Sequence, residues 1–171
     1  MRLKAMAKIN LGLDVLGKRE DGYHEVRMIM QTIRMYDILD IRKTRRPGIV
    51  LTTNLPFIPT DQRNLVYKAA QMLMEEFDVE EGLSIKLRKF IPVAAGMAGG
   101  SSDAAAAFVG VNRMFHLGLT EEQLMERAVK VGADVPYCIM RGTALAEGIG
   151  EKLTRLPEVP KCYVLIGKPG I

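Results

Sequence analysis

The chain has 171 residues, of which 48% are hydrophobic and 26% charged, and its formal net charge is +4. These values indicate an ordinary soluble globular protein, with room for one domain or for one domain and the start of another. No apolar run approaches the length of a membrane span, and the N-terminal stretch MRLKAMAKINLGL lacks the apolar core of a secretory leader, so we expect a cytoplasmic protein without a membrane partner.

The first third of the chain is predicted to be mainly β-structure. Residues 5–15 alternate between apolar and polar side chains, which is typical of a half-buried strand and puts Lys8 and Asn10 on its polar side. A polar loop, GKREDGYHE, follows this strand. The further predicted strands cover residues 25–35, 37–43 and 48–54.

The middle of the chain predicts three helices and one more strand. Asp61 is a candidate N-cap for the first helix, and Lys89 interrupts the apolar alternation of the strand. Thr120 and Gln123 form a capping box in front of the third helix. The predicted helices cover residues 64–79, 102–116, with Gly118 as a stop, and 121–131, and the predicted strand covers 83–91.

The last forty residues predict a hairpin and a further strand. The stretch GADVPYCIM breaks the third helix, and TALAEGIGEKLTRL is typical of a hairpin with a Gly-Ile-Gly turn. CYVLIGKPGI, at 162–171, begins another strand. This order is not the regular alternation of a doubly wound sheet. It predicts an α+β fold with a mixed or antiparallel sheet and its helices on one side.

Residues 91–108, IPVAAGMAGGSSDAAAAF, combine small residues with the start of a strong helix. The first turn of a helix has unpaired N–H groups and the positive end of the helix dipole. Glycines let backbone N–H groups approach a phosphate, and serine hydroxyls can add donors or bind Mg²⁺. The stretch therefore predicts a phosphate-binding loop for a nucleotide.

Two common phosphate-binding motifs are excluded by the spacing of this stretch. No lysine follows Gly100 as in a Walker loop, and the G-x-G-x-x-G spacing of dinucleotide-binding folds is absent. The alternative is close packing of a helix on a strand, with Ser102 as a simple helix cap.

The stretch PVAAGMAGGSSDAAA resembles the phosphate-binding motif of the GHMP kinases, the galactokinase, homoserine, mevalonate and phosphomevalonate kinase family. AKINLGLDVLGKREDGYHEV and GADVPYCIMRGTALAEGIGEKL resemble the members that phosphorylate 4-diphosphocytidyl-2-C-methyl-D-erythritol. The three motifs occur in the family's order and span nearly the whole chain. The resemblance implies an ATP-dependent kinase that uses ATP and Mg²⁺ and acts on this small-molecule substrate.

The resemblance also implies a domain arrangement. An N-terminal ATP-binding domain, expected over residues 1–158, would resemble the second domain of a small-subunit ribosomal protein and contain a left-handed βαβ connection. Residues 159–171 would begin a ferredoxin-like C-terminal domain. The chain is then expected to be truncated, and an inactive fragment is one of the open readings.

The resemblance assigns catalytic roles to Lys8 and Asp134. Asp134 would accept the proton of the substrate hydroxyl, and Lys8 would stabilise charge on the transferred phosphoryl group. From the residues alone, Lys8 is interpreted as a solvated charge on a strand, and Asp134 as a turn residue before Pro136. Sequence spacing cannot pair two residues so far apart.

The resemblance also assigns the nucleotide site. Ala94, Ala95 and Ala98 stand where some relatives carry glycine, which alanine can replace if these positions need no positive φ. Ser102 is the candidate Mg²⁺ ligand. The expected nucleotide-binding residues are Asn64, which could also be a helix cap, and Pro92, Val93, Ala94, Ala95, Gly96, Met97, Ala98, Gly99, Gly100, Ser101 and Ser102.

The substrate is expected to bind through Asn10, Tyr23 and His24. In the resembling enzymes the tyrosine ring stacks on cytosine and the histidine hydrogen-bonds the edge of the base. A loop tyrosine could instead cover the core. The open alternatives for the whole protein are another GHMP kinase, of homoserine or mevalonate type, and a nucleic-acid-binding module. Few aromatic residues accompany the basic ones, so we expect no nucleic-acid partner.

Overall fold

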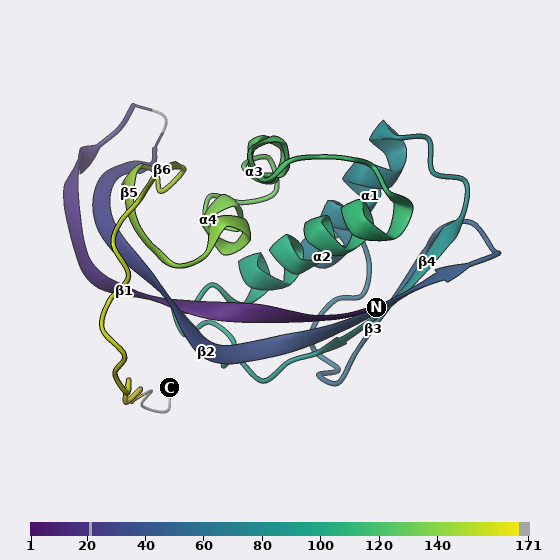
Figure 1. Cartoon of the computed structure of the whole chain (residues 1–171), viewed down its shortest axis with the longest axis horizontal. Helices are drawn as coiled ribbons and strands as arrows, with labels where there is room; N and C mark the ends of the chain where they lie inside the picture. The colour runs from purple at the N-terminus through teal and green to yellow at the C-terminus, as the bar shows by residue number, and fades with distance from the viewer. Residues whose placement is uncertain (21, 168–171) are drawn as a thin grey trace.

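One mixed sheet with helices along one of its faces makes up residues 1–20 and 22–167, the part of the chain that this computed structural model describes (Figure 1). The predicted α+β class and the placement of the helices on one side are confirmed. The strands are β1 (Arg2–Lys18), β2 (His24–Thr44), β3 (Ile49–Thr53), β4 (Gly82–Arg88), β5 (Thr143–Gly148) and β6 (Lys152–Arg155). The helices are α1 (Leu65–Glu76), α2 (Gly99–Phe115), α3 (Glu121–Ala128) and α4 (Val135–Met140).

The long strand β2 organises the sheet. The prediction of two separate strands, 25–35 and 37–43, was wrong, because no glycine or proline interrupts this stretch and it forms one continuous strand. One edge of β2 pairs with β1, whereas the other edge pairs first with β5 and then with β4. Residues 32–37 of β2 have neither β4 nor β5 as a partner on that edge. The candidate site lies beside this interval.

The first strand has two different halves. Around Ala7 the pairing with β2 shifts register, so that the consecutive residues Ala7 and Lys8 are both buried. The expectation of an exposed Lys8 on a polar face was therefore wrong. Beyond Asn10 the strand leaves the core and forms a curved arm with β2 (Figure 1). Leu11 and Leu13, which the alternation places on the apolar side of a half-buried strand, are about half exposed there.

The only parallel strand pair in the described sheet is β3 with β4, which α1 connects. A βαβ connection is thus present, and its left-handed sense stays a prediction. The N-cap of α1 is Asn64, whose side-chain oxygen accepts a hydrogen bond from Val66 N at 2.9 Å. The predicted cap, Asp61, instead accepts hydrogen bonds from Arg63 and so fixes the turn before the helix.

The helix α2 lies closest to the sheet and forms the centre of the core. Its run of alanines, 104–107, is buried, which allows a close approach. At Gly110 a Cβ atom would lie 2.5 Å from Ile41 Cδ1, so a larger residue there would displace the end of the Ile41 side chain. The helix begins at Gly99, three residues before the predicted start at Ser102, and its left-handed C-cap is His116 rather than Gly118.

The stretch after α3 contains a helix that sequence patterns did not predict. The capping box of Thr120 and Gln123 is confirmed at the start of α3. The following GADVPYCIM was expected only to break this helix, but Pro136 stands in the first turn of the short helix α4, where proline is tolerated. Tyr137 of α4 is buried and donates a hydrogen bond to Gly142 O at 2.7 Å. The predicted hairpin is confirmed as β5 and β6.

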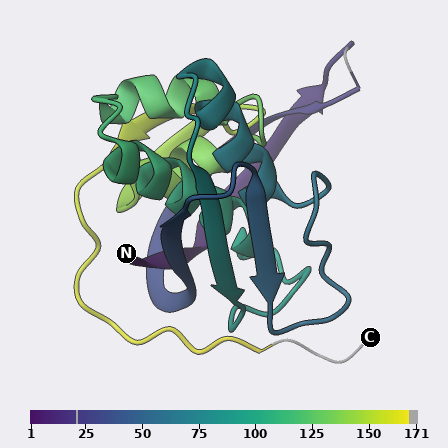
Figure 2. The ribbon, with the colours of Figure 1, turned by 90° about the vertical axis from the view of Figure 1, so that its right-hand side faces the viewer.

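The segment after β6 contains no regular element among its described residues, 156–167. The strand predicted to begin at Cys162 was wrong over 162–167, where Tyr163 and Leu165 are fully exposed and have nothing to pack against. Figure 2 shows this segment running outside the sheet and the helices. The rest of that predicted strand, 168–171, lies outside the described residues. Among the described residues, no helix is both long and apolar enough to cross a membrane.

Candidate functional site

The small-residue stretch forms a loop that enters the N-terminus of α2. The N-cap of this helix is Ala98, which has no side chain to cap the first turn. The first intrahelical bond of this turn runs from Ser102 N to Ala98 O at 2.8 Å. By helix geometry, the N–H groups of Gly99, Gly100 and Ser101 point out of the helix and stay available for an anionic ligand.

Two of the alanines in the loop have a left-handed backbone. Ala94 has φ 53° and Ala98 has φ 52°, while Gly96 between them has φ 71°. The expectation that the alanines need no positive φ was therefore wrong at these two positions. A left-handed conformation costs a non-glycine residue roughly 1–2 kcal/mol, which the surrounding structure must offset.

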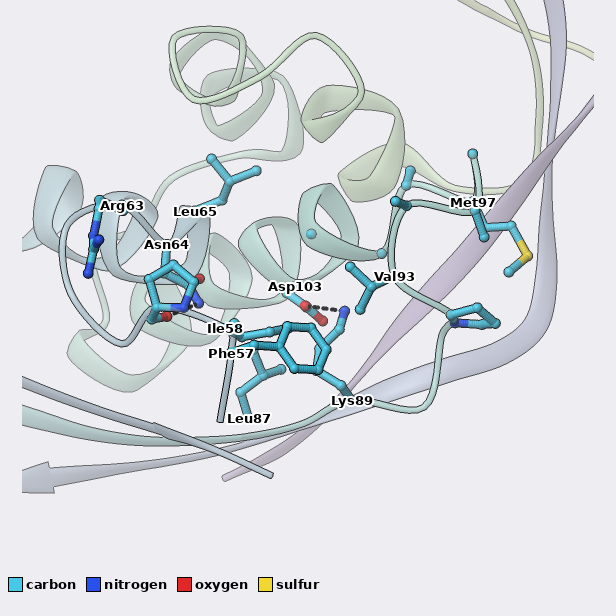
Figure 3. A pocket seen from close by; sticks show the side chains of 18 residues that line it. Phe57, Ile58, Arg63, Asn64, Leu65, Leu87, Lys89, Val93, Met97 and Asp103 are labelled. Carbon is cyan, nitrogen blue, oxygen red and sulfur yellow. Dashed lines mark hydrogen bonds and ion pairs between the residues drawn. The ribbon is translucent and has the colours of Figure 1, made fainter. Parts of the chain in front are cut away.

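The loop forms one wall of a pocket of about 460 Å³ (Figure 3). Phe57 and Ile58 line it from the segment before α1, and Lys89 and Asp103 lie close together in it (Figure 3). An apolar pocket that ends at exposed backbone N–H groups suits a ligand with a flat ring and a phosphate chain. The lining residues are Phe57, Ile58, Pro59, Arg63, Asn64, Leu65, Leu87, Lys89, residues 92–100 and Asp103.

The structure brings Lys8 and Asp134 together from opposite ends of the chain. Lys8 Nζ lies 3.7 Å from Asp134 Oδ2, and the same ammonium donates to Asn10 Oδ1 at 3.1 Å. The Lys8 side chain is 6% exposed and that of Asp134 is 31% exposed. Asp134 is the N-cap residue of α4 but its carboxylate makes no capping hydrogen bond. The carboxylate is therefore partly open to solvent and is not used by its own helix.

The Gly-Ile-Gly turn of the β5–β6 hairpin approaches the same carboxylate. Gly150 has φ 113°, and a Cβ atom there would lie 4.0 Å from Asp134 Oδ1. The sequence predicted this turn but gave no sign of its place beside Asp134. The hairpin thus contributes backbone to the surroundings of the carboxylate.

Contacts to β1 join the loop to the cluster of Lys8 and Asp134. Lys8 N donates to Met97 O at 3.2 Å, and Ser102 Oγ donates to Met6 O. Ser102 is buried, and its hydroxyl also lies 3.4 Å from Cys138 Sγ. Burial raises the pKa of the Cys138 thiol to about 12. The small-residue loop and the pair of charged residues are therefore joined through β1.

Asn64 lies at the pocket but its side chain is engaged in the fold. Its oxygen caps α1, and its amide nitrogen donates to Pro59 O at 2.8 Å. The cap reading of this residue is thus confirmed. A contact to a nucleotide stays a prediction.

Tyr23 and His24 lie at the far end of the arm, away from the pair of charged residues. The register of the hairpin pairs Lys18 with His24 near its tip and Lys8 with Thr32 near the core. Tyr23 is exposed, with 58% of its surface accessible. Asn10, where the arm leaves the core, is the one of the three predicted substrate residues that joins the Lys8 cluster.

Sequence patterns missed a buried group of three charged residues beneath the loop. Lys89 Nζ donates to Asp103 Oδ2 at 2.7 Å and also to Asp37 Oδ2, and all three side chains are buried. Burial holds the pKa of Asp103 well above its usual 3.8, the Asp37 carboxylate adds to this effect, and Lys89 opposes it. We name Asp37, Lys89 and Asp103 the buried triad. The only sign of the triad in the sequence is that each of its charged residues stands where an apolar side chain would be expected to face the core.

The described residues thus provide a pocket, free N–H groups, an ammonium and a half-open carboxylate. Such a set can hold a nucleoside triphosphate, neutralise charge on a transferring phosphoryl group and accept a proton. No group of three or more His, Cys, Asp or Glu side chains within residues 1–20 and 22–167 is arranged to hold a metal ion.

Part of the chain matches the model of a known kinase domain. Residues 64–142 match the family model described as "GHMP kinases N terminal domain", and the chain contains this domain. A curated relative from Lachnospira eligens, named 4-diphosphocytidyl-2-C-methyl-D-erythritol kinase, is 57% identical over the whole chain. The chain spans 59% of the length of that relative.

Solved structures agree with this assignment. A crystal structure of 4-(cytidine 5'-diphospho)-2C-methyl-D-erythritol kinase has 35% identity and a TM-score of 0.79, over 91% of this chain and 55% of that one. A mevalonate kinase from Methanococcus jannaschii has a TM-score of 0.70 over 92% of this chain and 56% of that one. At 15% identity the second likeness shows the fold alone.

Proposed function

We propose that the chain is the nucleotide-binding part of an ATP-dependent kinase that phosphorylates the 2-hydroxyl of 4-diphosphocytidyl-2-C-methyl-D-erythritol. The observation that supports this most is the distance of 3.7 Å between Lys8 Nζ and Asp134 Oδ2, beside the loop that leads into α2. The names of the relatives supply the substrate, and the chain covers only part of their length.

In this proposal Asp134 is the general base. Its carboxylate makes no capping bond and is partly open to solvent, so a substrate hydroxyl can reach it. As the substrate oxygen attacks the γ-phosphorus of ATP, its proton passes to Asp134 and ADP leaves with the electrons of the broken P–O bond. The phosphoryl group moves directly, without a covalent enzyme intermediate.

Lys8 and the loop supply electrostatic stabilisation. The Lys8 ammonium is buried and held by Asn10, so it meets the developing charge without first losing bulk water. The backbone of residues 92–100 and the N–H groups at the start of α2 would bind the phosphates. The apolar part of the pocket, with Phe57 and Ile58, would take the adenine ring.

The predicted Mg²⁺ ligand does not fit its role. Ser102 is buried inside the first turns of α2, and its hydroxyl already donates to Met6 O. We therefore assign Ser102 to holding α2 against β1. Mg²⁺ bound with ATP would neutralise phosphate charge during transfer.

Recognition of the substrate is proposed for the arm of β1 and β2. Tyr23 offers an exposed aromatic face for a cytosine ring, and His24 beside it offers a hydrogen-bonding edge. Asn10 would lie nearer to the reacting hydroxyl. We also propose the domain division near residue 158, a ferredoxin-like continuation after it, and a cytoplasmic location, where ATP is abundant and free thiols such as those of Cys138 and Cys162 persist.

The decisive experiment measures ADP release with Mg²⁺-ATP and 4-diphosphocytidyl-2-C-methyl-D-erythritol. It is run on this chain and on a version extended to the length of the relatives, with homoserine and mevalonate as rival substrates. Turnover of the cytidyl substrate alone by the extended protein supports the proposal. Turnover of a rival substrate instead would support a kinase but refute the roles of Tyr23 and His24. No activity of the extended protein with any of the three substrates would refute the kinase function.

A glycine in the first turn of α2 tests the phosphate site separately. At Gly100 a Cβ atom would meet only Leu65 Cδ1 at 3.7 Å, so Gly100→Ala fits the folded chain and favours the helix. A phosphate that rests on this turn would collide with the added methyl group. We expect unchanged or higher thermal stability and weaker Mg²⁺-ATP binding by calorimetry. If Gly100→Ala binds Mg²⁺-ATP as tightly as the wild-type chain does, the phosphates do not rest on this turn.

A further inference from the structure

We propose that Asp37, a buried carboxylate outside the pocket, positions the nucleotide-binding loop by holding both of its ends through the buried triad. The inference rests on the proposed function and deepens it, because it names a residue that controls ATP binding without touching ATP. Neither the sequence motifs nor the family resemblance points to this residue.

Asp37 lies in the interval of β2 that has neither β4 nor β5 as a partner, next to the last β2–β4 pair, Ile38 with Arg88. Beyond Arg88 the chain turns away from the sheet, so its N–H groups lose their ladder partners. The Asp37 carboxylate takes over this role, accepting from Phe90 N and, at 2.8 Å, from Ile91 N.

The other oxygen of Asp37, Oδ2, pairs with Lys89 Nζ. The same ammonium donates to Asp103 Oδ2, in the second turn of α2, at 2.7 Å. The contacts therefore run from β2 through the end of β4 to α2. Asp37 therefore holds the first end of the loop directly, and it is linked to the second end, at the start of α2, through Lys89 and Asp103.

The triad contacts the start of α2, where the proposed phosphate ligands lie. A Cβ atom at Gly99 would lie only 3.1 Å from Lys89 Nζ, so the ammonium packs directly against the first residue of α2. A movement of Lys89 would thus move the N–H groups that are proposed to hold phosphate. Lys89 and Asp103 line the pocket, whereas Asp37 does not. Asp37 can act on a ligand only by placing these other groups.

The test replaces Asp37 with asparagine of the same shape. The amide oxygen of Asp37→Asn can still accept from the loop, but its NH₂ group faces the Lys89 ammonium, donor against donor. The matched control is Asp40→Asn, on the same strand, where the carboxylate pairs with Arg2 and Arg88 near the surface. Both variants are compared with the wild-type chain at a temperature at which their melting curves show them folded.

We expect the Kd for Mg²⁺-ATP to rise by about ten-fold or more in Asp37→Asn, since small displacements of binding groups have effects of this size, and to stay unchanged in Asp40→Asn. A residue that only stabilised the fold would lower the melting temperature and leave the Kd of the folded protein unchanged. Wild-type binding by folded Asp37→Asn would therefore overturn the inference. If the wild-type chain itself binds no ATP, the proposed function fails and this inference fails with it.

A second measurement does not depend on the variant folding. Phe90 and Ile91 lie just outside β4, where N–H groups without partners exchange with solvent rapidly. Held by Asp37, both should be protected from hydrogen exchange in the wild-type chain, to the degree found for the amides of β4. Rapid exchange at both positions would show that Asp37 does not hold the loop, and would overturn the inference.

Discussion

Two lysine–carboxylate groups lie near the same loop. They differ in how deeply their carboxylates are buried and in how many hydrogen bonds these carboxylates accept within the fold. In the buried triad, Lys89 is enclosed by Asp37 and Asp103, and the carboxylate of Asp37 also binds two backbone N–H groups. In the other group, Lys8 stands 3.7 Å from an Asp134 carboxylate that is partly open and caps nothing.

The difference separates a charged group that shapes a site from one that reacts in it. A fully buried carboxylate that is paired within the fold cannot be reached by a substrate hydroxyl, whereas the partly exposed carboxylate of Asp134 can be. The triad has one exception, since Asp103 Oδ1 is buried without a hydrogen-bond partner among the described residues. The comparison predicts that changes at Asp134 alter catalysis, whereas changes in the buried triad alter stability and the placement of the loop.

The largest effect is expected at Asp134. In the extended protein, Asp134→Asn should lower kcat by about two to four orders of magnitude, because the general base is lost, while stability changes little. Steady-state kinetics and a thermal melt measure the two quantities. Asp78→Asn, an exposed carboxylate at the end of α1, is the control and should keep full activity. Nearly intact activity of Asp134→Asn would remove the base assignment.

The next effect is on folding and belongs to Lys89. Lys89→Met leaves the carboxylates of Asp37 and Asp103 buried without their cation, which should lower the free energy of unfolding by about 3–5 kcal/mol. Lys43→Met removes a lysine whose ion pair with Glu81 is exposed. It should change the free energy of unfolding by about 1 kcal/mol or less. Urea denaturation compares them. Equal losses in the two variants would mean that burial of the triad is not what matters.

The smallest effect is a pH-dependent change in the free energy of unfolding, and it tests the ionisation of Asp103. Burial raises the pKa of this carboxyl above its unfolded value of 3.8, so its protonated form contributes stability that is present below pH 3.8 and is lost as the pH rises through the raised pKa. Asp103→Asn can still accept from Lys89 and has no such loss. It should exceed the wild-type chain in unfolding free energy by about 1–3 kcal/mol at pH 8, and by less at pH 4.

Denaturant unfolding at these two pH values checks this expectation. A variant that is less stable than the wild-type chain at pH 8 would mean that ionised Asp103 stabilises the fold, and that its unpartnered oxygen has no cost.

Local sequence patterns predicted most of the fold correctly. The capping box of Thr120, the β5–β6 hairpin and the helices on one side of the sheet all follow from short-range chemistry. The long β2 was divided in the prediction, and α4 was missed because a proline inside an apolar stretch was taken only as a break. Burial of Lys8 depends on a shift of register, which no periodicity shows.

The site itself was less accessible to sequence reasoning. The loop could be found from its small residues, but the pairing of Lys8 with Asp134 needed a family resemblance, because the two residues lie at opposite ends of the chain. The buried triad brings together single charges from β2, the end of β4 and α2, and only the packed structure reveals that they meet.

The distance along the chain between Lys8 and Asp134 has a consequence for synthesis on the ribosome. The hairpin of β1 and β2 is local in sequence and can pair within microseconds of emerging. The carboxylate that pairs with Lys8 comes with α4. At a synthesis rate of about 5–20 residues per second, α4 is made roughly ten seconds later. Until then the hairpin has one wall of the site and no carboxylate opposite it. A nascent chain released before α4 emerges would therefore carry the loop but not the pair, and the pair is completed only once α4 has been made.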